Sequence, residues 1–410
     1  MPPDTTPRPR IFPALRHAPC IKNAQTRARF LATSTTMTAK RILLVHEDRL
    51  LGNMYRERLE SDGFAVESAR SGDAALRSIA ERQPDLVVLD SFTPSPDPAQ
   101  LIATLRKADS TRGLPVVVLP TSRLQLAEAA QTAGATYILA RTSNPMAELI
   151  DAVERSFGLA RTTTLSKGLP FRPDQSWVSM GLDSAPETVT ALRRSLHGVS
   201  RDTSDTASLR DLFQRIHGLS EQMAMLGQRP LFQFTSALEA LVFDLIRLPG
   251  QINPSTLRTL GQALDFLAIL LQEPQRSRVK DTSAANVLVV DDEDGARKIM
   301  MAAMRLAGLK SMAADTPTSG LSALANQPFD LVFLDVGLPE MTGFELCTKT
   351  RALTLHEHTP IVFVTGMSTF QNRVQSSLSG GNDFIGKPFN VAELGLKALL
   401  WVFKGQLGMV

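Results

Sequence analysis

The chain has 410 residues, of which 43% are hydrophobic and 21% are charged, and its formal net charge is +3. This composition is that of an ordinary globular protein with roughly two to four domains. Cys20 and Cys347, its two cysteines, lie in unrelated contexts, which argues against a disulfide framework and a zinc site. No apolar run approaches the roughly 18 residues of a membrane span, and no cleavable secretory pattern is present. We therefore expect a cytoplasmic protein that does not enter the membrane.

The first 38 residues differ in charge from the rest of the chain. Residues 1–37 hold five Arg and one Lys against a single acid, Asp4. We expect residues 1–38 to form a disordered basic tail. Its composition also fits a transit peptide or an arm that contacts nucleic acid or lipid. Translation from a start upstream of the true one is a further interpretation, because Met37 directly precedes the first strand pattern.

Short apolar runs and helical patterns alternate between residues 39 and 157. Runs typical of buried strands are Ile42–Val45, Asp85–Asp90, Leu114–Leu119 and Ala133–Arg141. Helical patterns such as Leu50–Leu59 and Ala74–Ile79 separate them. This alternation predicts a parallel sheet covered by helices.

Residues 158–182 are rich in Thr, Ser, Gly and Pro and are expected to be a linker. Apolar residues then recur at helical spacing in four segments, residues 189–199, 209–226, 238–248 and 257–271. Breaks are predicted at residues 227–230 and 249–254. An antiparallel helical bundle over residues 183–273 is the simplest arrangement.

After a second expected linker, residues 274–285, the strand and helix alternation returns over residues 286–410. Two buried strand patterns end in acid: Val287–Val290 is followed by Asp291 and Asp292, and Leu331–Leu334 by Asp335. Ligands of open parallel sheets bind at the carboxyl ends of the strands, so these three carboxylates should meet. Clustered carboxylates favour a hard divalent cation, and Mg²⁺ is the expected cofactor.

These residues resemble the receiver domain of two-component response regulators. Asp291 and Asp292 match its acidic pair and Asp335 matches its phospho-acceptor, 43 residues after Asp292. Thr365 matches the switch hydroxyl, and Lys387, which precedes Pro388, matches the lysine before a usually cis proline. The resemblance implies that Asp335 is phosphorylated with Mg²⁺ held by Asp291, Asp292 and Asp335. It also implies that Thr365 and then Phe384 move inward and repack the face of the last strand and helix.

Residues 39–157 resemble a second receiver domain whose site departs from the family pattern. Glu47 lies 43 residues before Asp90, the matching acceptor, but His46 takes the position of the first acid. Pro120 replaces the switch hydroxyl and Arg141 replaces the lysine. His46 should weaken Mg²⁺ binding. One interpretation is a degenerate receiver used for docking or dimerisation, and the other is an altered but active site with Asp90 as acceptor.

The second helical segment, around His217, resembles the phosphorylated helix of histidine phosphotransfer domains. Leu219, Leu226-Gly227 and Leu238-Glu239 fit that family, whereas Ser220 and Glu221 stand where it has lysine and glycine. Glu221 shares a helix face with His217 and would repel an incoming phosphoryl group. His217 is therefore either a phospho-acceptor or a surface histidine paired with Glu221 in an inert bundle. His197 lacks such a motif.

The sequence thus predicts a multidomain fold, with two doubly wound receiver-like α/β domains separated by an all-α antiparallel bundle. The expected function is phosphorelay signal transduction, in which Asp335 accepts a phosphoryl group from a histidine kinase or histidine phosphotransfer protein, with His217 and Asp90 as further candidate acceptors. The signal would leave by contact with another protein, with neither direct DNA binding nor enzymatic activity, and a homodimer is compatible. The alternative is a scaffold that only docks partners. A haloacid-dehalogenase type of enzyme ranks last, because Gly337 stands where a second acid is needed.

Overall fold

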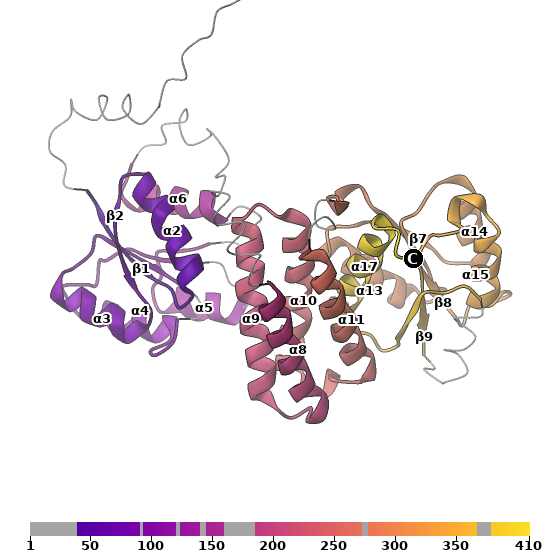
Figure 1. Ribbon diagram of the computed structural model, residues 1–410, viewed down its shortest axis with the longest axis horizontal. Coiled ribbons are helices and arrows are strands. Elements are labelled where there is room, and N and C mark those ends of the chain that lie inside the picture. The colour runs from indigo at the N-terminus through magenta and orange to yellow at the C-terminus, as the bar shows by residue number, and fades with distance from the viewer. Residues whose placement is uncertain are drawn as a thin grey trace, which may run out of the picture. The chain divides into compact units, whose positions relative to one another are not determined.

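Two five-stranded parallel sheets, separated in sequence by four long helices, make up the described part of the chain (Figure 1). The computed structural model describes residues 39–90, 93–119, 124–139, 145–159, 185–272, 278–366 and 379–410. The basic tail of residues 1–38, Pro120 and Arg141 lie outside the described residues. The predicted fold class, two doubly wound sheets and a helical region, is confirmed.

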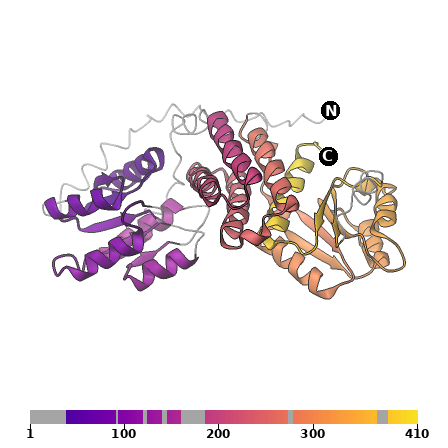
Figure 2. The ribbon, with the colours of Figure 1, turned by 90° about the horizontal axis from the view of Figure 1, so that it is seen from below.

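The first sheet has the strand order β2-β1-β3-β4-β5. Its strands are β1 Arg41–Val45, β2 Ala65–Ala69, β3 Leu86–Leu89, β4 Val116–Val118 and β5 Tyr137–Ile138. The helices that follow them are α2 Arg49–Ser61, α3 Gly72–Glu81, α4 Pro98–Lys107, α5 Leu124–Thr132 and α6 Pro145–Ser156. Successive strand residues point to opposite faces, so the apolar runs fill two separate cores. One core lies against α2 and α6 and the other against α3, α4 and α5 (Figure 2).

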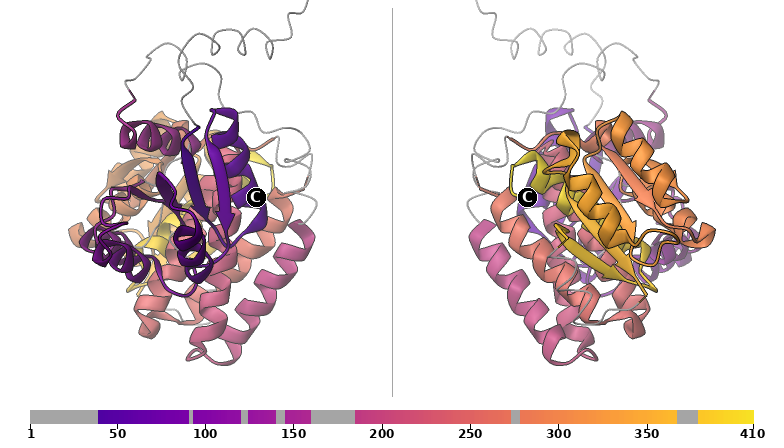
Figure 3. Two further views of the ribbon diagram at one scale, coloured as in Figure 1. Left: turned by 90° about the vertical axis from the view of Figure 1, so that its left-hand side faces the viewer. Right: turned by 90° about the vertical axis from the view of Figure 1, so that its right-hand side faces the viewer.

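The second sheet repeats this plan with the strand order β7-β6-β8-β9-β10. Its strands are β6 Asn286–Val290, β7 Lys310–Ala314, β8 Leu331–Asp335, β9 Ile361–Thr365 and β10 Asp383–Gly386. Its described helices are α13 Asp294–Leu306, α14 Pro317–Asn326, α15 Gly343–Arg351 and α17 Val391–Gln406. Helices cover both faces of this sheet too, with α13 and α17 on one core and α14 and α15 on the other (Figure 3).

Four helices, which we call the helical bundle, connect the two sheets in sequence: α8 Ala185–Arg201, α9 Thr206–Met225, α10 Arg229–Arg247 and α11 Pro254–Leu270. Helix α9 packs against α8 and α10, and α11 packs against α8. Asn253 starts α11 with a capping box. The break predicted at residues 227–230 is too long, because Arg229 and Pro230 already belong to α10. Proline is tolerated there, since the first turn of a helix has no acceptor for its missing N–H.

Residues 41–410 form one compact unit, in which the helical bundle shares a hydrophobic core with the second sheet. The ring of Phe234 on α10 lies 6.1 Å from that of Phe403 on α17 and 5.7 Å from that of Phe266 on α11. Such aromatic contacts add stability beyond the area that they bury. Among the described residues, none of the helices has the length and hydropathy to cross a membrane.

Candidate functional site

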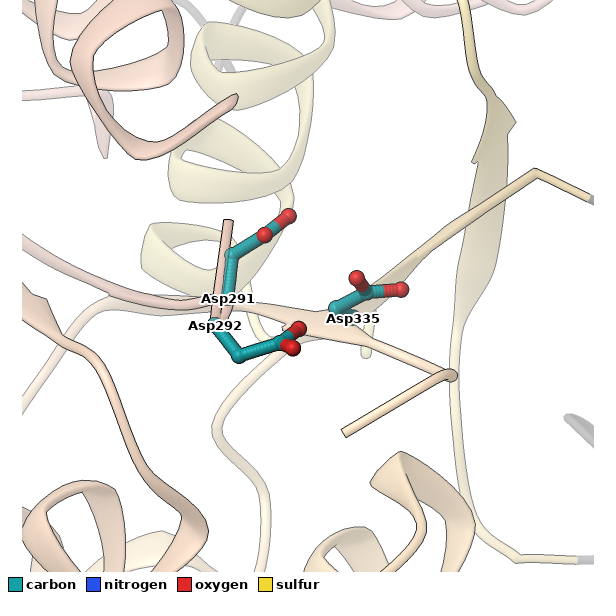
Figure 4. Close-up of side chains that lie close together, drawn as sticks. All are labelled: Asp291, Asp292 and Asp335. Atoms are coloured by element: carbon teal, nitrogen blue, oxygen red, sulfur yellow. The ribbon is translucent and has the colours of Figure 1, made fainter. Parts of the chain in front are cut away.

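Three carboxylates meet at the carboxyl end of the second sheet, as the strand-end positions predict. Asp291 and Asp292 follow β6 and Asp335 ends β8, and Figure 4 shows the three side chains side by side. One carboxylate oxygen from each lies within 4.8 Å of the others. We call these three residues the acid cluster. Asp291 is fully buried, Asp335 is 7% exposed, and Asp292 is exposed.

Lys387, which follows β10, places its ammonium group against the acid cluster. Its Nζ lies 2.8 Å from Asp291 Oδ2 and 2.8 Å from Asp335 Oδ2. Burial alone would lower the pKa of Lys387, but these two carboxylates outweigh it and raise the pKa, so the side chain is a cation at neutral pH. Burial raises the pKa of Asp291 above its ordinary value, although Lys387 opposes that change. The peptide bond between Lys387 and Pro388 is cis.

Backbone contacts hold the loops of the acid cluster in place. Arg297 on α13 donates to the carbonyl oxygens of Asp291, at 2.9 Å, and Asp292, at 2.8 Å. Gly343 lies so close to Asp335 that a Cβ at this position would overlap the Asp335 carbonyl oxygen. Glycine is therefore required by close approach rather than by a special φ angle. Sequence reasoning did not assign a role to Arg297, because its i+6 position after Asp291 has no motif of its own.

The donors of the acid cluster fit a hard divalent cation. They offer carboxylate oxygens and no nitrogen or sulfur, which is the ligand set of Mg²⁺. Two buried acids share the single ammonium of Lys387, so a second positive charge would relieve their remaining repulsion. Among the described residues, these are the only three His, Cys, Asp or Glu side chains grouped closely enough to hold a metal. The matching positions of the first sheet form no such group within the described part of the chain.

The two expected switch residues lie on the strands beside the acid cluster. Thr365 ends β9 and is 4% exposed. Phe384 lies on β10 and is half-buried, and the guanidinium of Arg258, from bundle helix α11, stacks 3.9 Å above its ring. An arginine over an aromatic face is an attractive cation–π contact. The ring of Phe384 therefore contacts the helical bundle through Arg258.

A buried polar network, which sequence reasoning missed, extends the contact between β10, α17 and the helical bundle. Lys397 on α17 is fully buried and its Nζ lies 2.6 Å from Asp383 Oδ2. The Nε1–H of Trp401 donates to the same carboxylate at 3.2 Å, and Lys397 also donates to Gln262 of α11 at 3.3 Å. Glu393 accepts hydrogen bonds from two hydroxyls of α11. A lysine 14 residues after an aspartate on another element has no periodicity that could have revealed this pair.

The first sheet presents a different set of side chains at the equivalent end. His46, after β1, is 6% exposed and Asp90, after β3, is 4% exposed, while Glu47 is exposed. The backbone N–H of Asp48 donates to His46 Nδ1 at 3.1 Å, which in the neutral ring places the proton on Nε2. Burial alone would lower the pKa of His46, but Asp90, Glu221 and Asp48 raise it to about 9. An imidazole whose cationic form is favoured by three carboxylates thus occupies the position of an acid.

His217 is a buried residue of the bundle and not a surface histidine. It is 6% exposed, and its Nδ1 lies 3.0 Å from Oε1 of Glu239, which is fully buried on α10. Its Nε2 lies 3.6 Å from Oε1 of Glu221. Burial alone would lower the pKa of His217, but Glu239, Glu221 and Asp90 outweigh it and raise the pKa. The pairing with Glu221 is as expected, whereas the surface location is wrong because α9 packs against α8, α10 and the first sheet's helices. His197, on α8, is exposed.

Comparison with known proteins agrees with this geometry. The sequence profile of the response regulator receiver domain matches residues 42–154 and 287–398, which leaves the helical bundle outside the match. The probable transcriptional regulatory protein TcrX of Mycobacterium tuberculosis is 34% identical over 125 residues, 30% of this chain and 53% of TcrX. The regulatory protein AtoC of Escherichia coli is 31% identical over 116 residues, 28% of this chain and 24% of AtoC. The chain therefore spans about half or less of these relatives' lengths. The structure of the chemotaxis response regulator CheY4 of Vibrio cholerae is 30% identical and covers 29% of this chain and 98% of its own, with a TM-score of 0.28.

Proposed function

We propose that this chain, which belongs to the response regulator receiver domain family, accepts a phosphoryl group on Asp335 from a phospho-histidine of a histidine kinase or histidine phosphotransfer protein. The observation that carries the proposal is the single cation of Lys387, held 2.8 Å from both Asp291 and Asp335 at the edge of the second sheet. A carboxylate beside a fixed ammonium is a nucleophile with its counter-charge already in place.

In this reaction the phosphorus–nitrogen bond of the donor breaks and a phosphorus–oxygen bond to an Asp335 carboxylate oxygen forms. The imidazole of the donor leaves with the bonding electron pair and takes up a proton. Asp291, Asp292 and Asp335 would hold Mg²⁺, which when bound supplies positive charge for the phosphoryl oxygens. Lys387 supplies a further positive charge, and the hydroxyl of Thr365 is the candidate contact for the phosphoryl group.

The signal then leaves, in our proposal, through the face formed by β10 and α17. Phe384 on this face contacts Arg258, and Lys397 contacts Gln262. Both partners belong to α11, so movement of Phe384 or Lys397 changes the contacts of the face with this helix. Phosphorylation acts as a shift between two packings of this face. A downstream protein would bind this face or the bundle that covers it, and its affinity would differ between the two packings. The scaffold alternative is not favoured, because the groups needed for phosphoryl acceptance lie together.

A relay step at His217 is a second candidate, supported by one specific contact. Glu239 holds Nδ1 at 3.0 Å, which makes Nε2 the nitrogen that would carry a phosphoryl group. The carboxylate of Glu221, 3.6 Å from Nε2, opposes this step by charge repulsion. His217 phosphorylation would therefore require displacement of Glu221.

Labelling tests these assignments together. The full chain is incubated with Mg²⁺ and a radiolabelled phosphoryl donor, and label is compared in wild type and in the variants Asp335→Asn, Asp90→Asn and His217→Gln. We expect base-labile label that only Asp335→Asn abolishes. Acid-labile label removed by His217→Gln would establish the relay step. Absence of label with several competent donors would refute the proposed function. Asp330→Asn, an exposed aspartate directly before β8, is the control and should keep its label.

A further inference from the structure

The site end of the first sheet and the helical bundle, mainly helix α9, line an open cavity of about 610 Å³. Its lining on one side includes His46, Asp90 and Arg70, and on the other side His217 and Glu221. Helices α2 and α6 of the first sheet's domain pack against α9 beside it. Two of the departures from the family pattern, a histidine in place of an acid and a glutamate in place of a glycine, thus line the same space.

These two departures complement each other. Oε2 of Glu221 lies 3.8 Å from Nε2 of His46, and its Oε1 lies 3.6 Å from Nε2 of His217. The carboxylate therefore stands between two imidazoles, each with a proton-bearing or protonatable nitrogen toward it. His46, His217, Glu221 and Asp90 are all less than a tenth exposed. Buried charges are tolerated when opposite charges face them, and here each histidine faces at least one carboxylate.

An acid at position 46 would destroy this arrangement. It would lie beside the carboxylates of Asp90 and Glu221, which both favour a positive charge at position 46, and like charges in a buried site repel each other. Glycine at position 221, in turn, would leave His46 and His217 facing each other, and both have raised pKa values. The histidine at position 46 and the glutamate at position 221 therefore stabilise each other by opposite charge.

We propose that the degenerate receiver is an intramolecular docking module for helix α9, in which His46 binds Glu221 and the docked domain covers His217. Its partner is thus a histidine-bearing helix of its own chain. The carboxylate of Glu221 is the anion that lies between the two histidines. Because this anion is part of the chain, docking needs no phosphoryl group on either domain. The covered state limits access of other proteins and reagents to Nε2 of His217. This inference is independent of phosphorylation at Asp335.

Histidine accessibility in the full chain tests the proposal. Modification by diethyl pyrocarbonate is followed site by site by mass spectrometry, with exposed His197 as internal standard. In wild type we expect His217 to react at least about tenfold more slowly than His197. His46→Asp should raise the His217 rate about tenfold, the size of a lost contact between buried charges. Asp265→Asn, which removes an exposed carboxylate of the bundle, should leave the rate unchanged.

A charge exchange separates docking from general damage to the fold. In the double variant His46→Asp, Glu221→Lys the pair has opposite charges again, so slow modification of His217 should return. Hydrogen exchange of residues 206–225 should follow the same pattern, faster in the single variant and slower in the double, while exchange of β6 and β8 stays constant. If His217 reacts as fast as His197 in wild type, or if the double variant is no better protected than His46→Asp, the docking proposal is wrong.

Discussion

Replacing Lys397 by Met should strongly destabilise the second sheet and its contact with the helical bundle. The side chain is fully buried, and its ammonium lies 2.6 Å from Asp383, whose own side chain is 4% exposed. Removal of the lysine leaves this carboxylate buried without a counter-charge, held by the indole N–H of Trp401 at 3.2 Å and the backbone N–H of Phe384 at 2.8 Å. Breaking a buried pair from one side typically costs about 3–5 kcal/mol. Lys298→Met, which breaks an exposed pair on α13, should leave the free energy of unfolding almost unchanged.

Urea unfolding followed by tryptophan fluorescence measures this cost. A Trp177→Phe background leaves Trp401, which lies beside the ion pair, as the only tryptophan. The double variant Lys397→Met, Asp383→Asn should recover most of the lost free energy of unfolding, because no buried charge remains. A loss below about 1 kcal/mol for Lys397→Met, or a double variant as unstable as the single, would refute the reasoning that a buried unpaired carboxylate sets the cost.

Three further predictions follow from single contacts. Gly343→Ala should destabilise the second sheet by about 3 kcal/mol, because its Cβ overlaps a backbone carbonyl, whereas Gly261→Ala, with open space around it, should be neutral or stabilising in urea unfolding. Arg258→Ala should cost about 1 kcal/mol through loss of the stack on Phe384, and the same unfolding assay measures it. The pKa of His46 is raised to about 9, so the stability it contributes is present below pH 6.5 and lost as pH rises through 9. Unfolding measured in urea between about pH 6 and 10 should show this loss, and His46→Asn should remove that pH dependence.

The sequence predicted both sheets and the acid cluster because each depends on local patterns. Short apolar runs that end in acid mark buried parallel strands, and strand ends meet at one edge whatever the details of packing. The Lys397 pair with Asp383 could not be predicted, since it depends on which turn of α17 faces β10. The burial of His217 was likewise out of reach. It depends on how α9 packs against neighbouring helices, and a histidine at the edge of an apolar stripe fits either a core or a surface position.

The two receiver-like sites solve one electrostatic problem in opposite ways. At the second sheet, acids converge and their repulsion is relieved by Lys387, and the exposed carboxylate of Asp292 completes a set of three donors that fits a divalent cation. At the first sheet, His46 replaces one acid and interacts favourably with Asp90. Fewer carboxylates repel one another there, so a metal ion would relieve less repulsion. A carboxylate from outside the domain can then approach His46, and Oε2 of Glu221 lies 3.8 Å from its Nε2. The substitution that weakens metal binding is therefore also the one that permits docking to α9.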